Sequence, residues 1–452
     1  MIYQLIDLFG YACVLAGLFF LLVGNLKGNF IMLLFAIPFE NTINILPSVS
    51  LIKALSIITF FSFIVHGRNF VPFIFKNLVI NKFILSFVAI FFSAALVGEN
   101  HGNFLNEMTG FIQNIMILSI CWYAVKRMPG SMPWIEKAFI FYGLAILILI
   151  FSVHDISVFK ERLFLSRFLG PNTIAVLYSG LAVLAYTYWR LSGSKFYLLA
   201  FAAFGVAIIL SGNRSLPFGF VFFILLSFFL NLKVNKIRLF VLAGSLAVIF
   251  FVFPFDDDSF INNSRSRVLY GFEQFYDLII QGSEEMSTEE RSQKTNILRT
   301  SNIQKDIRTD LYRKTVESAM ENPILGTGPG TSNITIERYF GISKNPHSNF
   351  NLLLLDYGLT GFIFFMIVEF VFIRFGYKNI SSVEGKQFFV LLVMFSIDGL
   401  VHTNLKDSIV ILFLAITGFK VGINISYVKS RLLKQKGARL SHPGRQMAKK
   451  VI

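Results

Sequence analysis

The sequence has few charged residues and almost no cysteine. Only 15% of its 452 residues are Asp, Glu, Lys or Arg, whereas a soluble chain usually carries about 25%. Hydrophobic residues make up 55% of the chain, and phenylalanine alone occupies 54 positions. This composition excludes an ordinary soluble fold and predicts an all-α, polytopic membrane protein, because apolar stretches of this kind cross bilayers as helices.

Groups that would hold a metal or form a disulfide framework are also missing. Cys13 and Cys121 each lie inside an apolar run, which is typical of small packing residues and excludes a thiolate metal site. A Gly-x-Ser-x-Gly nucleophile motif and paired carboxylates are absent. The six histidines are scattered singly, so a multi-histidine site would need a long-range coincidence; they are His66, His101, His154, His347, His402 and His442. The sequence therefore offers no candidate for a resident metal ion or cofactor.

Apolar stretches long enough to cross a membrane follow one another along most of the chain. They predict about 12 membrane-spanning helices, or 13 if the stretch 30–65, which contains Pro38 and Pro47, forms two spans. The expected helices lie near 3–23, 30–65, 83–98, 104–124, 135–153, 172–189, 196–212, 215–231, 237–254, 350–374, 387–403 and 407–427.

One long polar segment sets the expected topology. Residues 255–349 hold 14 acidic and 11 basic residues, which leaves 12 acidic and 30 basic residues in the rest of the chain. The basic connections fall on the side opposite this segment, so the positive-inside rule predicts that they are cytoplasmic. We expect a transmembrane bundle over 1–254, a periplasmic segment over 255–349, further spans over 350–427 and a basic cytoplasmic tail over 428–452. The membrane would be the inner membrane of a bacterium.

The polar segment contains two local patterns. Apolar residues such as Ile303, Ile307 and Val316 recur at helical spacing and predict an amphipathic helix over about 299–321, ended by Asn322-Pro323. The run Gly326-Thr-Gly-Pro-Gly330 then predicts a tight bend. It does not form a nucleotide-binding loop, since no Gly-Lys-Ser/Thr follows.

Several arginines on the expected outer side are candidate anion-binding groups. Arg214 lies in a short connection just before Pro217, where the N-terminus of the next helix favours an anion such as phosphate; the alternative is an interface anchor. Arg308 and Arg313 lie on the amphipathic helix, near Tyr312. Surface ion pairs with nearby aspartates are their alternative role.

A histidine and a possible intramembrane pair complete the candidates. His347 closes the outer segment, and its pKa near neutrality suits general-base chemistry on a hydroxyl, although a polar interface residue is the alternative. Asp398 and His402 are one helical turn apart and are candidates for pairing within the membrane.

The order of these motifs resembles the bacterial O-antigen ligase and O-antigen polymerase superfamily over roughly residues 170–365. Members commonly have His-Asn where this chain has His347-Ser348-Asn349, and often Trp where Tyr312 stands. The motifs that carry the resemblance are Gly170-Pro-Asn172, Ser211-Gly-Asn-Arg-Ser215, Arg308-Thr-Asp-Leu-Tyr312, Asn322-Pro-Ile-Leu-Gly326 with Gly328 and Gly330, Pro346-His-Ser-Asn-Phe350 and Asp356-Tyr-Gly-Leu-Thr-Gly361.

The resemblance implies a metal-independent, inverting membrane glycosyltransferase that uses a glycan on undecaprenyl pyrophosphate. Arg214 and Arg308 would hold the pyrophosphate, and His347 would assist the acceptor hydroxyl. Fixed arginines suit this task because they stabilise the negative charge that the leaving group gains. The implied partners are the lipid-linked donor, a glycan or lipid A-core acceptor, membrane lipid and a chain-length regulator. Further implied contacts to pyrophosphate or glycan come from Arg313, Asn172, Tyr312 and Asn349.

The alternatives differ in what the protein does with the lipid-linked glycan. We favour an O-antigen polymerase, on the Phe-rich character of the chain and its His-Ser-Asn variant, over an O-antigen ligase that transfers the polymer to lipid A-core. A flippase or other transporter would more typically show an internal repeat and charges spread through several helices. Nucleic-acid binding is excluded because the basic residues are divided among separate connections.

Overall fold

The computed structural model describes residues 2–39, 43–46, 49–76, 78–97, 101–153, 171–211, 216–217, 219–221, 223–224, 315–332, 334, 337, 348–401 and 408–422. Most of these residues are helical, which confirms the predicted helical class. Four helices within the described ranges are long and apolar enough to cross a membrane, and several shorter apolar helices accompany them. The expected total of 12 or 13 spans stays a prediction.

The stretch 30–65, for which the sequence predicts either one span or two, is divided by a small hairpin. Ser50 caps the second helix by accepting a hydrogen bond from the backbone of Lys53 at 3.4 Å. Buried polar groups join the helices, since the Asn29 side-chain amide lies 2.8 Å from the Ser62 hydroxyl. The elements here are α1 (Ile2–Leu22), α2 (Leu26–Ala36), η1 (Ile37–Phe39), β1 (Asn44–Leu46), β2 (Val49–Ser50), which pairs antiparallel with β1, and α3 (Leu51–His66).

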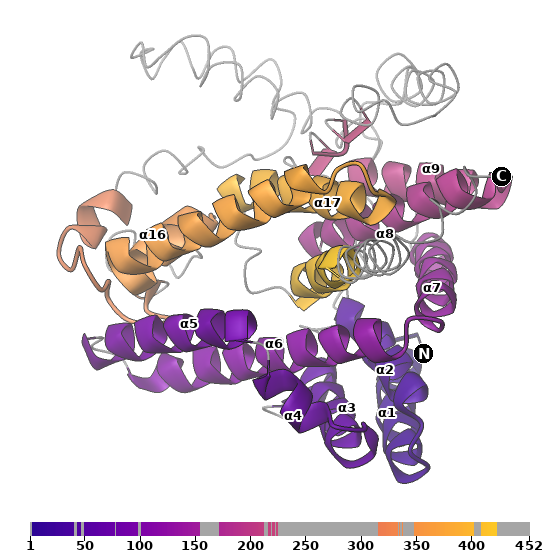
Figure 1. The fold of residues 1–452 in the computed structure, drawn as a ribbon, viewed down its shortest axis with the longest axis horizontal. Coiled ribbons are helices and arrows are strands. Elements are labelled where there is room, and N and C mark those ends of the chain that lie inside the picture. The colour runs from indigo at the N-terminus through magenta and orange to yellow at the C-terminus, as the bar shows by residue number, and fades with distance from the viewer. Residues whose placement is uncertain are drawn as a thin grey trace, which may run out of the picture.

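Among the remaining described helices, α7, α9 and α17 pack against α8. Most of the apolar window of α8 is buried (83%), whereas only 11% of the window of α16 is. Figure 1 shows α16 and α17 along one side and α5 and α6 along the other. The helices are α4 (Phe70–Phe75), α5 (Leu78–Val97), α6 (His101–Arg127), α7 (Met132–Val153), α8 (Pro171–Ser192), α9 (Lys195–Leu210), α16 (Asn349–Lys378), α17 (Val383–Val401) and the unlabelled helix Ser408–Gly422.

Aromatic side chains fill the space between these helices. Tyr178 of α8 stacks on Phe204 of α9, with ring centroids 5.3 Å apart. Gly180 leaves room for the ring of Phe413, because a Cβ atom at this glycine would lie 2.2 Å from that ring. Cys13 and Cys121 are both buried and unpaired, which confirms that they are packing residues.

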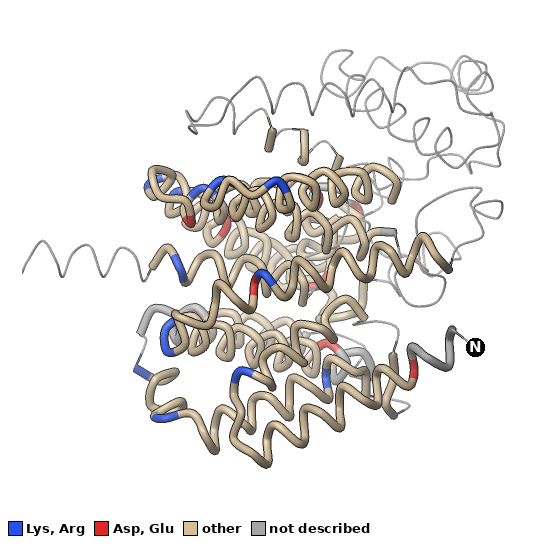
Figure 2. The backbone as a smooth tube through the Cα atoms, turned by 90° about the vertical axis from the view of Figure 1, so that its right-hand side faces the viewer, with Lys and Arg blue, Asp and Glu red and all other residues tan. Residues whose placement is uncertain are grey.

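The basic connections lie together at one end of the bundle. The Tyr123 hydroxyl donates to the carbonyl of Arg68 at 3.1 Å, which joins the α3–α4 connection to the end of α6. Arg190 at the end of α8 lies near enough to Lys386 of α17 for their charges to interact. Figure 2 shows most of the described lysines and arginines in the left half of the view. We call this the basic end, defined by Arg68, Lys126, Arg127, Lys137, Arg190 and Lys386.

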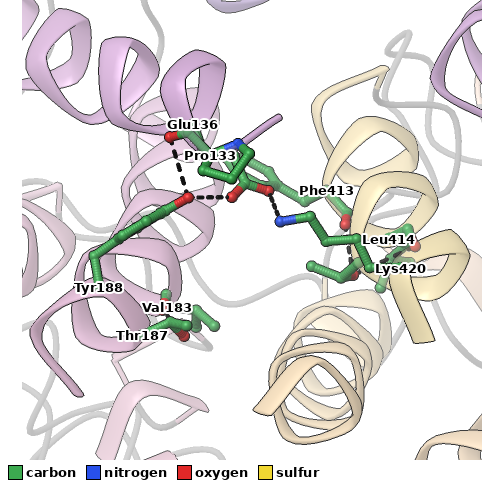
Figure 3. Close-up of polar contacts among 9 residues, drawn as sticks. Pro133, Glu136, Val183, Thr187, Tyr188, Phe413, Leu414 and Lys420 are labelled. Atoms are coloured by element: carbon green, nitrogen blue, oxygen red, sulfur yellow. Dashed lines mark hydrogen bonds and ion pairs between the residues drawn. The ribbon is translucent and has the colours of Figure 1, made fainter. Parts of the chain in front are cut away.

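A polar cluster holds the basic end to the last described helix (Figure 3). Glu136 of α7, which is 4% exposed, forms an ion pair with Lys420 of the helix Ser408–Gly422. The Tyr188 hydroxyl lies 2.7 Å from Oε2 of Glu136 and 3.1 Å from the carbonyl of Pro133. Lys137 lies over the ring of Tyr188, 5.5 Å from its centroid. Three helices distant in sequence are thereby joined.

Candidate functional site

Helix α16 is broken at Gly358, and the break is filled by the glycine-rich bend. Gly358 has φ 61° and ψ −162°, which is not helical. In a continuous helix the N–H groups of Leu359 and Thr360 would donate four residues back. They donate instead to the carbonyls of Pro323 and Ile324, at 2.8 and 3.1 Å. A segment distant in sequence thus supplies the acceptors at the break.

The bend also supplies donors to the same break. The N–H of Thr327 donates to the carbonyl of Leu355 at 2.7 Å, and that of Gly328 to the carbonyl of Asp356 at 3.2 Å. These carbonyls are the ones that Leu359 and Thr360 would use in an intact helix. Four hydrogen bonds to residues 323–328 therefore replace two within the helix, so that the break leaves none of these backbone groups unpaired.

Two glycines allow the chain segments to approach this closely. Gly326 has φ 75°, and a Cβ atom there would lie 2.5 Å from the carbonyl oxygen of Leu355. A Cβ atom at Gly358 would lie 2.6 Å from the backbone nitrogen of Gly326 and from the carbonyl of Ile324. Real Cβ atoms do not come this close to backbone, and the φ and ψ of Gly358 belong to a region open essentially to glycine alone.

Asp356 fastens the far side of the bend to α16. Its side chain is fully buried. Oδ1 accepts a hydrogen bond from the N–H of Ser332 at 2.9 Å, and Oδ2 accepts one from the N–H of Gly330 at 3.1 Å. The Thr331 hydroxyl donates to the carbonyl of Gly328 at 2.6 Å and so closes the bend on itself. Hydrogen bonds to a charged acceptor are the stronger kind, which makes Asp356 the main side-chain contact here.

The outer half of α16, Asn349–Tyr357, is enclosed by protein on several sides. Leu353 and Tyr357 pack with Phe91 and Ala94 of α5. Leu355 packs instead against Ala319. Ser348 caps the helix by accepting a hydrogen bond from the N–H of Asn351 at 3.0 Å. His347, the candidate base, directly precedes this cap in the sequence. The enclosed half-helix is therefore the described element next to it.

The helix before the bend differs from its prediction. Of the expected helix 299–321, the structure describes residues 315–319 as helical, and Ala319 is buried as expected. Val316 and Met320, which the spacing placed with the apolar residues, are 49% and 72% exposed, while Thr315 and Ser318 are buried. The small side chains face inward because this turn packs closely against Leu355 of α16.

Most of the predicted site residues lie outside the described residues; they are Arg214, Arg308, Tyr312, Arg313 and His347. Asn172 is the second residue of α8 and is exposed, and Asn349 is the first residue of α16 and is buried. Asp398 is buried in α17, and its expected partner His402 is not described. The roles of all these residues stay predictions.

The described residues next to Arg214 and those next to His347 lie toward the same end of the bundle, but they are well separated from each other. Helix α9 begins at the basic end with Lys195 and ends before Ser211, and α16 ends at the basic end with Lys378. The end of α9 and the start of α16 therefore both point away from the basic end, toward what we call the opposite end. In Figure 1 the bend lies at the left end of α16, well separated from the short helical pieces of 216–224 near α9.

Within the described ranges, no three His, Cys, Asp or Glu residues lie together as a candidate metal site. His347 and the acidic run Asp256–Asp258 fall outside the ranges.

Comparisons with known proteins bear on the segment that contains this break. Residues 198–366 match the family model described as O-antigen ligase. No curated protein matches the chain. The family match covers a little over a third of the 452 residues and includes the Gly-rich bend, Asp356 and the break in α16. Over this segment the match confirms the resemblance to the O-antigen ligase and polymerase superfamily that the motifs indicate.

Proposed function

We propose that this chain is an inverting glycosyltransferase of the inner membrane, which polymerises O-antigen or related polysaccharide repeats from undecaprenyl pyrophosphate on the periplasmic face. One observation carries the proposal. The family match over 198–366 includes every residue that the resemblance assigns to catalysis or to pyrophosphate or glycan binding, except Asn172. A ligase that transfers the polymer to lipid A-core is the second candidate, supported by the description of the matching model as O-antigen ligase.

The arrangement of charge supports the proposed orientation. The basic end gathers the connections that the positive-inside rule assigns to the cytoplasm, and Figure 2 shows this concentration among the described residues. Helix α9 ends at the opposite end, shortly before Arg214 in the sequence, and helix α16 begins there, two residues after His347. We therefore propose that the opposite end faces the periplasm, with 255–349 as the periplasmic segment and 428–452 as a cytoplasmic tail.

The proposed chemistry needs one base and a group that stabilises the leaving pyrophosphate. His347 takes the proton from the acceptor hydroxyl as its oxygen bonds to the anomeric carbon of the donor glycan. The bond from that carbon to the pyrophosphate breaks with inversion, and undecaprenyl pyrophosphate leaves with the electron pair. Arg214 and Arg308 bind the charge that develops on it. In this scheme the arginines do the work for which other enzymes use a divalent ion.

The lipopolysaccharide of a deletion strain tests the proposal and separates its two forms. A polymerase predicts core carrying a single repeat, whereas a ligase predicts bare core with accumulated lipid-linked polymer. Wild-type protein should restore the normal ladder of bands, and a properly inserted His347→Ala protein should not. Transfer in purified membranes should survive EDTA. An unchanged ladder in the deletion strain would overturn both forms, and activity lost to EDTA and restored by magnesium would overturn the arginine scheme.

A further inference from the structure

The two chain segments that carry the candidate chemical groups are fastened to each other at the break in α16. One segment is the helix 315–319, which begins two residues after Arg313, and which continues into the bend. The other is the outer half of α16, which begins two residues after His347. The exchange of backbone hydrogen bonds at Gly358 and the contact between Ala319 and Leu355 hold one against the other.

Within this joint, the side chain of Asp356 accepts two hydrogen bonds from the backbone of the bend. It lies eight residues after the cap Ser348, about 12 Å along the helix at 1.5 Å per residue. Its two carboxylate oxygens hold Gly330 and Ser332, on the far side of the bend from the backbone exchange at Thr327 and Gly328. The bend is therefore held at both of its sides: by backbone groups and the Thr327 hydroxyl on one side, and by the carboxylate of Asp356 on the other.

We propose that Asp356 is a positioning residue, which sets the arginine-bearing segment relative to His347 by holding the bend 326–332 on the outer half of α16. This inference rests on the proposed function, because it concerns the geometry of that reaction. Asp356 is buried beneath the bend, and both of its carboxylate oxygens accept backbone hydrogen bonds. It acts on the alignment of the reacting groups. The transfer rate is sensitive to this alignment, because a displacement of about 1 Å can lower the rate about 100-fold.

Replacement by asparagine is the sharpest change, because it keeps the size of the side chain and removes one acceptor. In Asp356→Asn one backbone N–H, that of Gly330 or Ser332, faces an amide NH₂ and loses its partner. We expect kcat for glycan transfer to fall by about 10- to 100-fold, while KM for the lipid-linked donor stays within about twofold. A merely structural defect would lower the amount of folded enzyme and leave kcat per folded molecule unchanged.

A second measurement reports on the bend without any transfer assay. Ser332→Cys places a thiol at a side chain that is only 3% exposed, and the native Cys13 and Cys121 are also buried. In the otherwise wild-type protein this thiol should react slowly with a membrane-impermeant maleimide. Adding Asp356→Asn should raise its rate of labelling at least about tenfold, since the N–H of residue 332 loses its charged acceptor.

Glu369→Gln is the matched control, because it neutralises a half-buried carboxylate farther along the same helix. It should change neither kcat nor the labelling of Ser332→Cys. If Asp356→Asn prevents insertion, Thr327→Val provides a milder variant, which removes only a hydroxyl 3.0 Å from the carbonyl of Leu355; we expect a smaller change of the same sign in both measurements.

The two measurements separate failure of the inference from failure of the proposed function. Normal kcat in a folded Asp356→Asn protein, with or without faster labelling, overturns the positioning role and leaves the glycosyltransferase standing. Unchanged labelling overturns the clamp itself. If the wild-type protein transfers no glycan, the proposed function falls, and with it the role in alignment, while labelling still tells whether Asp356 holds the bend.

Discussion

The basic end and the opposite end of this protein are held together by different kinds of contact. At the basic end, side chains join helices that are complete in themselves, as in the ion pair of Glu136 with Lys420 and its contact with Tyr188. At the opposite end, backbone groups of the bend replace hydrogen bonds that α16 has lost at Gly358. The first arrangement tolerates changes of side chain, and the second requires particular backbone conformations.

This difference is expected if chemistry takes place at only one end. Irregular backbone at a membrane helix is costly unless it is enclosed by protein, and broken helices are a common device at substrate sites in membrane proteins. The outer half of α16 is enclosed by α5 and by residues 315–332, whereas the inner half exposes apolar side chains such as Ile363, Ile367 and Phe370. We therefore expect variants at the opposite end to affect transfer, and variants at the basic end to affect stability alone.

The largest effect is expected for Arg214 and Arg308, to which the proposed function assigns the pyrophosphate. If Arg214 and Arg308 hold pyrophosphate through paired N–H donors, Arg→Lys at either position should lower transfer by about 100-fold or more, because lysine keeps the charge and loses the planar fork. The measurement is kcat/KM per folded molecule with lipid-linked donor.

The matched control for this prediction lies at the basic end. Arg127 is positioned over the ring of Phe73, 5.9 Å from its centroid, and lysine can form the same kind of cation–π contact. Arg127→Lys should therefore retain normal transfer. Full activity in Arg214→Lys and Arg308→Lys would show that charge alone suffices, and would remove the case for a bidentate grip on the pyrophosphate.

A smaller but still large effect is expected for Gly358→Ala. The variant must bring a Cβ atom within 2.6 Å of backbone atoms of the bend, in a conformation that costs a non-glycine residue about 1–3 kcal/mol before any clash. We expect a lower melting temperature in detergent and transfer reduced by at least about tenfold per folded molecule, because the bend is displaced from α16.

Gly110→Ala on α6 is the control for this change. A Cβ atom at Gly110 meets nothing within 4 Å, and alanine is favoured over glycine within a helix by about 0.5–1 kcal/mol. This variant should be as stable as the wild type or slightly more so, with normal transfer. Equal behaviour of the two variants would mean that the break at Gly358 is not needed for function.

The sequence predicts the separate parts of the opposite end, which are the helices and the glycine-rich bend, but not how they pack against each other. Membrane helices were predictable because long apolar runs satisfy backbone groups internally, and the bend was predictable because Gly326, Gly328 and Gly330 are close in sequence. The docking of that bend on α16 was not, since it pairs backbone groups about 30 residues apart and leaves no periodic signal. Asp356 was recognised only as part of a motif around Gly358.

The burial pattern of residues 315–320 shows a second limit of prediction from the sequence. Spacing alone placed Val316 and Met320 with the apolar residues, yet both are exposed, and Thr315 and Ser318 are buried. Helical periodicity reports which residues share a face, and assigns the apolar face to the interior on the assumption that water lies outside. Close packing against α16 selects small side chains instead, and that selection depends on a neighbour that the local sequence does not reveal.

The smallest effect is expected at the basic end, from Glu136→Gln. The substitution keeps the shape of the side chain and its contact with Tyr188, but leaves Lys420 without its counter-ion. Removing one partner of such a pair costs about 1–3 kcal/mol, and the lower part of that range applies because the Lys420 side chain is 19% exposed and partly solvated. Thermal unfolding in detergent would measure the loss, and transfer per folded molecule should stay normal.

Two companion variants make this last test specific to the ion pair. Lys420→Met combined with Glu136→Gln should lose less stability than the sum of the two single changes, because neither charge is then left alone. Lys137→Met, which removes only a cation 5.5 Å above the ring of Tyr188, should cost about 0.5–1 kcal/mol and show no such coupling with Lys420→Met. A fully folded Glu136→Gln protein that cannot transfer glycan would break the comparison, since the basic end would then take part in the reaction.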